Sequence, residues 1–321
     1  MFFLGEKKLS VSLLKYTPDP QEIVAMGAKL CYSGADIEAL KQGIVSRDQA
    51  PFLERLMDLS HLSPIEHASF TFGIEGVSRS LLAQITRHRI ASFSVKSQRY
   101  VPATPAGGTA GTAGVSVNKV NLIDAATGAA AGAANPAVTE VGAANPSGAL
   151  ANGGCSAFPS AATAAGATGA AADGAGVAVE ADGVFGYIIP PQIKDLGPGA
   201  VSLFESQMRQ IQAWYNEWVE KLGNQGEKSF EDARFVLPNA AETKMLVTMN
   251  ARELLHFFTL RCCNRAQWEI RALAREMLKL VKPVAPVIFR EAGPACLKGP
   301  CPEGKMSCGK REKVRKEFLN P

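Results

Sequence analysis

The first part of the chain alternates between the hydrophobic period of a strand and that of a helix. Residues 8–16 alternate apolar and polar side chains, which predicts a half-buried strand. Asp19 offers an N-cap and Pro20 a first helical residue with a fixed backbone angle, so a helix is expected to run to about Cys31. A strand followed by a helix is therefore the first unit that the sequence predicts.

A second strand is expected between two further helices. Residues 47–59 place their large apolar side chains on one helical face, and the Ser-Pro pair at 63–64 marks the connection that follows. Residues 67–75 alternate phenylalanine or isoleucine with small residues, which is the period of a strand. From 77 to 89 the helical period returns, and we expect this helix to end in a basic triplet.

Helices dominate the predictions for the C-terminal half. An amphipathic helix is expected over 201–222, and another starts near residue 250. The second is interrupted before Asn264, which resembles a capping pair with Gln267 and predicts a further helix over 265–281. Strands and helices alternate along the chain, so the predicted fold class is α/β (α+β), a central β-sheet flanked by helices.

Composition divides the chain into segments. Residues 104–185 are dominated by Ala, Gly, Thr, Ser and Asn, and contain the pentapeptide Gly-Ala-Ala-Asn-Pro twice. So little apolar surface cannot offset the entropy of ordering the segment, which we predict to be a long disordered insertion. One folded domain is then expected from 1–103 and 186–290, with a basic, cysteine-containing tail at 291–321.

Charge and cysteine content narrow the function classes. The Ala/Gly-rich segment holds one lysine against five acidic residues, so the net charge of +4 understates how basic the flanks are. A basic excess suits anionic ligands, including nucleotides or nucleic acid. The N-terminus has no signal-peptide pattern and no apolar run reaches spanning length, which predicts a cytoplasmic protein. The seven cysteines show no disulfide framework and are expected to be thiols.

The densest chemical signal is the basic triplet and the residues after it. Arg87, His88 and Arg89 are followed by Ser97 and then by Arg99-Tyr100. Guanidinium groups bind phosphate through two parallel hydrogen bonds, hydroxyls donate to phosphate or base, and planar groups cover a ring. The block therefore indicates an anion site with stacking surfaces. Each residue taken singly is equally compatible with a solvated basic helix end.

Taken together, these residues resemble the RHR-x7-S signature of the flavin-dependent thymidylate synthases, the ThyX family. Further segments resemble the family in the right order along the chain. They are His61–His67 for H-x-x-P-x-E-H, Gln84 three residues before the triplet, Glu231–Pro238 for E-x-x-R-x-x-L-P, and Asn250–Arg261 with Ala266–Ile270 for N-A-R…L-R…A-Q-W-E-I. The resemblance covers roughly 8–102 and 186–290 and implies a ThyX-type fold with these ranges as the catalytic domain.

The resemblance implies a role for each matching position. The implied dUMP-binding residues are Gln84, Arg87, Ser97, Gln98, Arg99, Arg234 and Arg261. The implied FAD-binding residues are Ser63, Arg87, His88, Arg89, Asn250, Ala251, Arg252 and His256. Arg261 would also be catalytic, because a fixed positive charge at the uracil edge favours the electron-rich form of the ring and so activates its C5 carbon.

The family's reaction converts dUMP to dTMP without a cysteine nucleophile. NADPH would reduce FAD, and methylene-tetrahydrofolate would supply the carbon. Family members are homotetramers with shared active sites, so we expect the triplet and the Arg261 region to meet across subunit interfaces. One departure is that Ser94-Val95 stands where the family often has Asn-Glu, so any contact made by that acidic side chain is absent here.

Alternatives to this reading stay open. Cys296, Cys301 and Cys308 could bind zinc with a fourth ligand from elsewhere, or lie in a flexible tail too polar to pack; otherwise no metal site is predicted. The basic run at 310–316 could attract RNA, although aromatic residues for stacking are nearly absent around it and nucleic-acid binding is the weaker prediction. The competing functions are a flavin- or nucleotide-binding protein without methyl transfer and a basic RNA-binding module.

Overall fold

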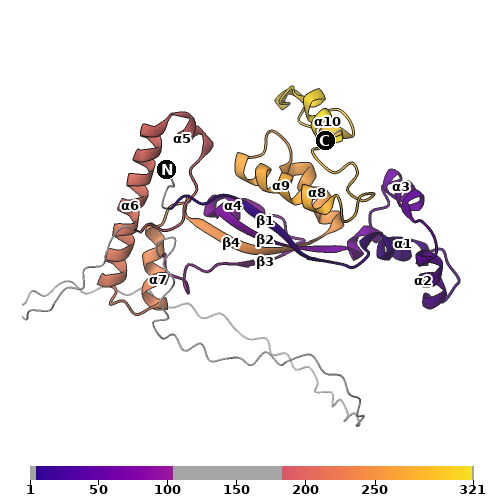
Figure 1. The fold of residues 1–321 in the computed structure, drawn as a ribbon, viewed down its shortest axis with the longest axis horizontal. Helices are drawn as coiled ribbons and strands as arrows, with labels where there is room; N and C mark the ends of the chain where they lie inside the picture. The colour runs from indigo at the N-terminus through magenta and orange to yellow at the C-terminus, as the bar shows by residue number, and fades with distance from the viewer. Residues whose placement is uncertain (1–4, 104–182, 320–321) are drawn as a thin grey trace, which may run out of the picture. The chain divides into compact units, whose positions relative to one another are not determined.

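The structure is a computed structural model that describes residues 5–103 and 183–319, so the predicted insertion lies outside the described residues except for its last three positions (Figure 1). The strands are β1 (Ser10–Tyr16), β2 (Ser69–Ser78), β3 (Ala91–Val95) and β4 (Glu242–Asn250). The helices are α1 (Pro20–Leu30), α2 (Ile37–Val45), α3 (Ala50–Asp58), α4 (Arg79–Ile85), α5 (Pro191–Asp195), α6 (Pro198–Lys221), α7 (Glu227–Ala233), α8 (Ala251–Arg261), α9 (Trp268–Val281) and α10 (Arg311–Leu319). Short 3₁₀ turns are η1 (Pro64–His67), η2 (Arg234–Val236), η3 (Ala295–Leu297) and η4 (Gly304–Met306).

The four strands form one antiparallel sheet in the order β1-β2-β4-β3. Because side chains alternate between faces, every second residue of β2 and β4 points to the same side. On that side Phe70 and Phe72 of β2 and Val247 of β4 are fully buried. The expected fold class, a β-sheet with flanking helices, is confirmed.

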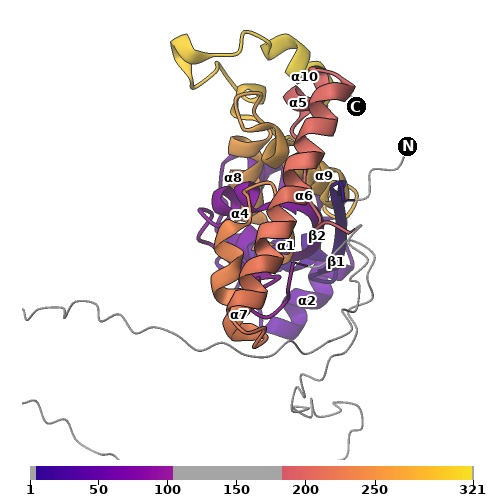
Figure 2. The same cartoon turned by 90° about the vertical axis from the view of Figure 1, so that its left-hand side faces the viewer.

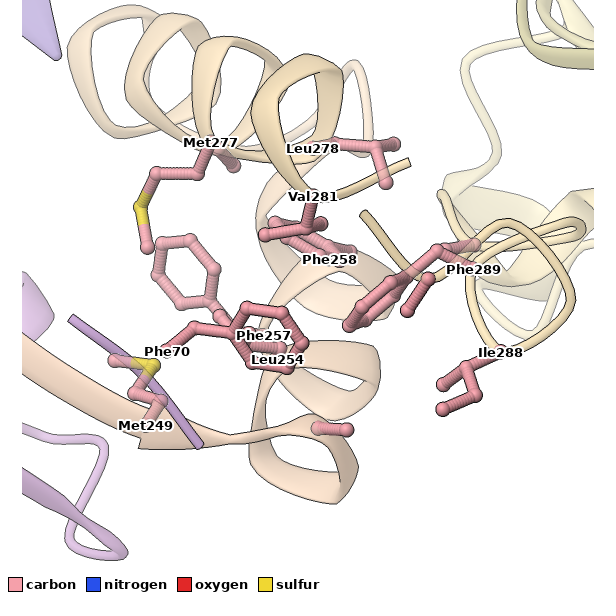
Figure 3. Close-up of a cluster of buried hydrophobic side chains, with 14 of the residues drawn as sticks. Phe70, Met249, Leu254, Phe257, Phe258, Met277, Leu278, Val281, Ile288 and Phe289 are labelled. Atoms are coloured by element: carbon pink, nitrogen blue, oxygen red, sulfur yellow. The ribbon is translucent and has the colours of Figure 1, made fainter. Parts of the chain in front are cut away.

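Helices α8 and α9 cover the buried face of the sheet, as Figure 1 shows. Figure 3 shows the core between them, where aromatic rings meet edge to face. The ring centroids of Phe70 and Phe289 are 5.5 Å apart, and those of Phe258 and Phe289 are 6.1 Å apart. Such pairs add roughly 0.5–1.5 kcal/mol each to the burial of their area. This core fixes α8, which carries much of the candidate site.

The end of β2 corrects the predicted helix over 77–89. The strand continues to Ser78, whose hydroxyl accepts a hydrogen bond from the Leu81 backbone N–H at 3.1 Å and caps α4. The Ser78 N–H and hydroxyl in turn donate to the two carboxylate oxygens of Glu269, at 2.7 and 2.5 Å. α4 is therefore a short helix that ends at Ile85, and the basic triplet follows it in a turn.

Gly76 explains why the strand bends before α4 begins. Its φ is +66°, and the register between β2 and β4 shifts across this position. A Cβ there would lie 1.9 Å from the Lys8 carbonyl oxygen, so only glycine fits this close approach.

Several helix starts differ from the sequence prediction. Asp19 has a left-handed backbone and makes no side-chain cap, although α1 begins at Pro20 as expected. α3 starts at Ala50, three residues after the predicted position. The α9 cap is Gln267, whose Oε1 accepts from the Glu269 and Ile270 backbone N–H groups, so the helix begins later than the Asn264 pattern predicted.

Several elements were not predicted from the sequence, namely α2, α5, α7, α10, β3 and β4. α2 is capped by Asp36, whose Oδ1 accepts from the Ala39 N–H at 2.8 Å. β3 contains Ser94 and Val95, whose backbone pairs with Leu246 and Met245 of β4. Where Ser94-Val95 stands in place of the family's Asn-Glu, the backbone therefore pairs with β4 within the sheet.

A second hydrophobic core forms between α6 and the residues that precede it, from Val184 to Ile189. Val184 and Phe185, at the end of the predicted insertion, are buried with Tyr187 against this helix. Figure 2 shows α6 as a long helix with α7 beside it. Although α6 has 24 residues, no helix in the described part of the chain combines the length and apolar content needed to cross a membrane.

The C-terminal segment packs more tightly than its composition predicted. Cys296 and Leu297 of η3 and Val314 and Phe318 of α10 are buried and join the main core. The expectation of a tail too polar to pack is therefore wrong, because a few spaced apolar residues are enough to dock a short helix. Arg311 and Arg315 of α10 add hydrogen bonds to the carbonyls of Cys296 and Leu297, at 3.3 and 2.9 Å.

Candidate active site

The start of α8 is fixed by local hydrogen bonds. Asn250 caps the helix, since its Oδ1 accepts from the Glu253 backbone N–H at 2.9 Å. Ala251 is fully buried and donates its N–H to the Ala68 carbonyl at 2.8 Å. The next residues therefore have a set orientation, with Glu253 turned inward and Arg252 and His256 turned outward.

Glu253, His88 and Arg261 form a chain of hydrogen bonds. His88 Nδ1 lies 2.9 Å from a carboxylate oxygen of Glu253, and Arg261 Nε donates to His88 Nε2 at 3.1 Å. Because Nε2 accepts a hydrogen bond, we assign the proton of a neutral imidazole to Nδ1, from which it is donated to Glu253. Both ring nitrogens are used inside the protein, so His88 holds the Arg261 side chain in place.

Electrostatics favour the neutral state of this histidine. Burial is the largest influence and lowers the pKa of His88 below its ordinary value of 6.5. The hydrogen bond to Glu253 opposes this shift, and the positive charge of Arg261 adds to it. Burial and the charge of Arg87 also lower the pKa of Arg261. The guanidinium groups of Arg87 and Arg261 lie near each other, and buried His88 holds that of Arg261. Their combined positive charge favours binding of an anion.

A cavity of about 790 Å³ lies beside this chain of hydrogen bonds. Its walls include Glu253 and His256 from α8, and the His256 ring centroid is 6.0 Å from that of His88. The cavity is also lined by Met57, Ser60, Leu62, Glu66, Ile90, Asn250, Arg252, Leu255, Thr259, Glu291, Ala292, Gly293, Pro294, Ala295 and Lys298. About half of these residues are apolar and the others offer hydrogen bonds and charges of both signs, so the cavity can take a large organic ligand with polar groups.

A second basic group lies around α7. Arg99 makes ion pairs with Glu227 at 2.6 Å and with Glu231 at 2.8 Å. Arg234 donates from Nε to the Glu231 carbonyl at 3.0 Å. Burial and the charge of Arg234 lower the pKa of Arg79, which places a further guanidinium in this group.

Helix α4 lies between the two basic groups. Arg79 is its first residue and Arg87 follows its last turn, so the seven residues of the helix separate them by roughly 10 Å of helical rise. Arg261 and His88 meet within one chain, which corrects the expectation that the triplet and the Arg261 region would meet across an interface. Within residues 5–103 and 183–319, no hydrogen bond or ion pair joins the group around Arg261 to the group around Arg99.

The remaining predicted residues have simpler surroundings. Gln84 donates to the Ser80 carbonyl at 3.4 Å, and the Ser97 hydroxyl accepts from the Arg99 N–H at 3.1 Å. Gln98 lines a small cavity of about 90 Å³. Ser63 and Arg89 are exposed, while Arg252 makes an ion pair with Glu66 at the wall of the large cavity.

Sequence reasoning missed two residues of the site. Glu253 is 7% exposed, and an acid buried to this extent beside an N-cap signals an internal partner. Its partner, His88, is 165 positions away, so no local pattern identifies the pair. Arg79 stood at the start of a predicted helix with nothing nearby to distinguish it from a surface residue.

Comparisons with known proteins show the family of this chain. The family model Thy1, described as thymidylate synthase complementing protein, matches residues 12–287. The flavin-dependent thymidylate synthase of Geobacter sulfurreducens is 41% identical over 317 residues, covering 97% of this chain and 98% of that protein. This chain belongs to the flavin-dependent thymidylate synthase family.

Other members and a solved structure extend the comparison. The flavin-dependent thymidylate synthase of Clostridium tetani is 38% identical over 322 residues, covering 97% of each chain. The crystal structure of PolB, a UMP/dUMP methylase from Streptomyces cacaoi bound with 5-Br UMP, aligns with a TM-score of 0.51. At 16% identity, over 90% of this chain and 95% of that one, it supports the fold alone.

The family is flavin-dependent, and the residues present fit an FAD. The large cavity combines apolar walls for a flat ring system with Arg252 and Lys298 for anionic phosphates. Arg252 is 54% exposed and its ion pair with Glu66 is solvent-accessible, so the guanidinium can exchange partners at small cost. The cavity next to His88 is therefore the candidate FAD site.

Proposed function

We propose that this chain converts dUMP to dTMP as a flavin-dependent thymidylate synthase. The observation that carries the proposal is the chain of hydrogen bonds from Glu253 through His88 to Arg261 at the side of the large cavity. It holds one guanidinium in a fixed direction next to a site of cofactor size. A nucleotide placed between them would face both a cofactor and a fixed positive charge.

The proposed nucleotide site uses the guanidinium groups at both ends of α4. Arg87, beside Arg261, is exposed and accessible to a phosphate or a base. Arg261 stabilises negative charge that develops on the uracil ring, and a preorganised charge of this kind does not have to reorient during the reaction. The other proposed dUMP-binding residues are Gln84, Ser97, Gln98, Arg99 and Arg234.

The proposed FAD site is the large cavity with its polar rim. When bound, FAD supplies the oxidation–reduction chemistry that methyl formation requires. Arg252 and Lys298 offer positive charge to its phosphates, and Asn250 and His256 offer hydrogen bonds at the wall. Ser63, Arg87, Arg89 and Ala251 complete the proposed set. His88 is proposed here as a residue that positions Arg261 rather than as a direct phosphate ligand.

NADPH and methylene-tetrahydrofolate are the proposed co-substrates, and a homotetramer is the proposed assembly. In the described part of one chain, no contact joins the groups around Arg99 and Arg261. In an assembly, the Arg99 group of a second copy can lie beside the Arg261 group of the first and complete the nucleotide site. Leu14 and Leu246, on the sheet face opposite the core, are 48% and 46% exposed, as expected of a surface that another copy covers. Light scattering on the protein as it elutes from a sizing column tests the assembly, and a monomer at working concentration would contradict it.

A cytoplasmic location remains part of the proposal.

Activity is tested by the release of tritium from 5-tritiated dUMP in the presence of NADPH and methylene-tetrahydrofolate. Release that depends on all three reactants supports the proposal. A yellow protein that binds dUMP but releases no tritium would instead indicate a flavin- and nucleotide-binding protein without methyl transfer. A colourless protein that cannot be reconstituted with FAD and retains RNA would favour the RNA-binding alternative.

A further inference from the structure

Four cysteines from separate parts of the sequence gather at one place in the fold. Cys263 lies in the turn between α8 and α9, and Cys296, Cys301 and Cys308 lie in the segment that leads to α10. The sequence alone suggested the last three and an unknown fourth partner. The structure supplies Cys263 as that partner, and all four are free thiols.

Direct contacts hold the C-terminal segment against the α8–α9 turn. Asn264, next to Cys263, donates from Nδ2 to the Cys308 sulfur at 3.9 Å. Arg265 donates to the Met306 carbonyl and lies 3.3 Å from the Glu303 carboxylate. These contacts join the α8–α9 turn to the stretch from Glu303 to Cys308.

The surroundings of Cys296 place the other three thiols near it. Cys296 is buried in the main core, and Cys301 packs against the same core. The thiols of Cys263, Cys301 and Cys308 all lie close enough to Cys296 to act on it electrostatically. Four neighbouring thiols are a ligand set suited to a metal centre with four thiolate ligands.

Positive side chains surround this thiol cluster. Cys308 lines a cavity of about 520 Å³ together with Arg271, Arg275 and Lys310. Arg311 donates from Nε to the Cys296 carbonyl at 3.3 Å. A metal centre with four thiolate ligands carries net negative charge, and these cations would compensate it.

The spacing of the thiols indicates the kind of metal centre. Zinc holds each thiolate at about 2.3 Å, so its four sulfur atoms crowd around one point. Over residues 5–103 and 183–319, no three His, Cys, Asp or Glu side chains converge enough to share a single ion. An iron–sulfur cluster binds the same four thiolates around a larger inorganic core. We propose that these four cysteines hold an iron–sulfur cluster.

The other described cysteines do not belong to this site. Cys262 is 1% exposed, and burial raises the pKa of its thiol to about 12. Its side chain is part of the main hydrophobic core. Cys31 is exposed at the end of α1 and donates to the Gly27 carbonyl. Cys31 therefore offers a matched control.

The site adjoins the candidate FAD cavity. Ala295 and Lys298, on either side of Cys296 and Leu297, are part of the cavity wall. A cluster at the four cysteines would fix this wall and the C-terminal segment relative to α8. The proposal concerns binding of the cluster and does not depend on thymidylate synthesis.

The test is the metal and acid-labile sulfide content of the full-length protein purified without oxygen, before and after reconstitution with ferrous iron and sulfide. We expect about two to four irons per chain, with matching sulfide, in the parent and in Cys31→Ser. Cys308→Ser and Cys301→Ser should lose most of both, with an unchanged far-ultraviolet circular dichroism spectrum. Chemical analysis is needed because flavin absorbance overlaps that of a cluster.

Three results would overturn the proposal. The first is about one zinc per chain without sulfide, which would assign the thiols to a single ion. The second is a reconstituted parent with neither iron nor sulfide. The third is iron retained by folded Cys301→Ser and Cys308→Ser at the level of Cys31→Ser. None of these readouts uses dUMP, so failure here is distinguishable from failure of the proposed activity.

Discussion

At the scale of single residues, His88 shows how burial decides the role of a side chain. In the sequence it is one of three basic-looking residues, but the structure buries it to 6% exposure while Arg87 and Arg89 stay exposed. Its two nitrogens connect Glu253 to Arg261. The motif therefore singled out these residues together, whereas the role proposed for each depends on tertiary contacts.

Replacing His88 with Ala should release the Arg261 side chain and leave the Glu253 carboxylate buried without its partner. We expect a stability loss of roughly 1–3 kcal/mol and a fall in kcat for tritium release that the conservative His88→Gln variant partly restores. His61→Ala, an exposed histidine, is the control. Unchanged kcat in His88→Ala with FAD retained would contradict the positioning role.

The lowered pKa of His88 also predicts how stability varies with pH. The unfolded chain protonates this residue near 6.5, whereas the folded protein protonates it at a lower pH. The contribution of the neutral ring is therefore complete above 6.5 and is lost as pH falls from there toward the folded pKa. The difference in unfolding free energy between parent and His88→Gln should shrink between about pH 7.5 and about pH 5.5. Urea unfolding measures it, and a pH-independent difference would refute this account.

At the scale of elements, the junction of β2, α4 and α9 determines where the basic triplet lies. Glu269 is 3% exposed and receives two hydrogen bonds from Ser78. Burial raises the pKa of its carboxyl group, and the Ser78 bonds oppose that shift. The carboxylate joins the start of α4 to the start of α9, two elements far apart in sequence.

Glu269→Ala should destabilise the fold by about 1–3 kcal/mol, because the Ser78 N–H and hydroxyl would lose their buried acceptor. Glu276→Ala on the exposed side of α9 should change stability by less than about 0.5 kcal/mol. Thermal and urea unfolding of both variants provide the measurement. Equal effects of the two substitutions would show that the buried acceptor contributes little.

Local sequence signals predicted the elements with strong periodicity or caps, including β1, α1, β2, α6 and α8. β4 had such a signal, because Thr243, Met245, Val247 and Met249 are buried at every second position. β3 lies within the RHR-x7-S segment, which was interpreted only for its binding residues and not for its secondary structure. The packing of the C-terminal segment could not be predicted from its polar composition, since it depends on Val314 and Phe318 reaching a core built elsewhere.

At the scale of the whole molecule, the ends of the two described stretches at Ala103 and Phe185 meet at one side chain. Buried Gln212 of α6 donates from Nε2 to the Ala103 carbonyl at 2.9 Å and accepts from the Phe185 N–H at 2.8 Å. The two ends that border the segment 104–182 therefore lie at nearly the same point. The length of that segment has a small effect on the entropy of closing this loop.

Deleting residues 106–183 should consequently leave FAD binding intact and the melting temperature within a few degrees of the parent. Val184 and Phe185 are kept because they are buried in the core beside α6. The flavin spectrum and a thermal melt of the purified deletion variant are the measurements. A soluble apoprotein that cannot be reconstituted would show that the segment contributes to the cofactor site.

The most direct test of the central claim is tritium release by Arg261→Ala, measured together with its FAD content. The account places this guanidinium beside the nucleotide, held by His88 and separate from the cavity assigned to FAD. It predicts that FAD is retained while turnover falls by on the order of 100-fold or more. Turnover equal to that of the parent, at equal FAD content, would contradict the claim.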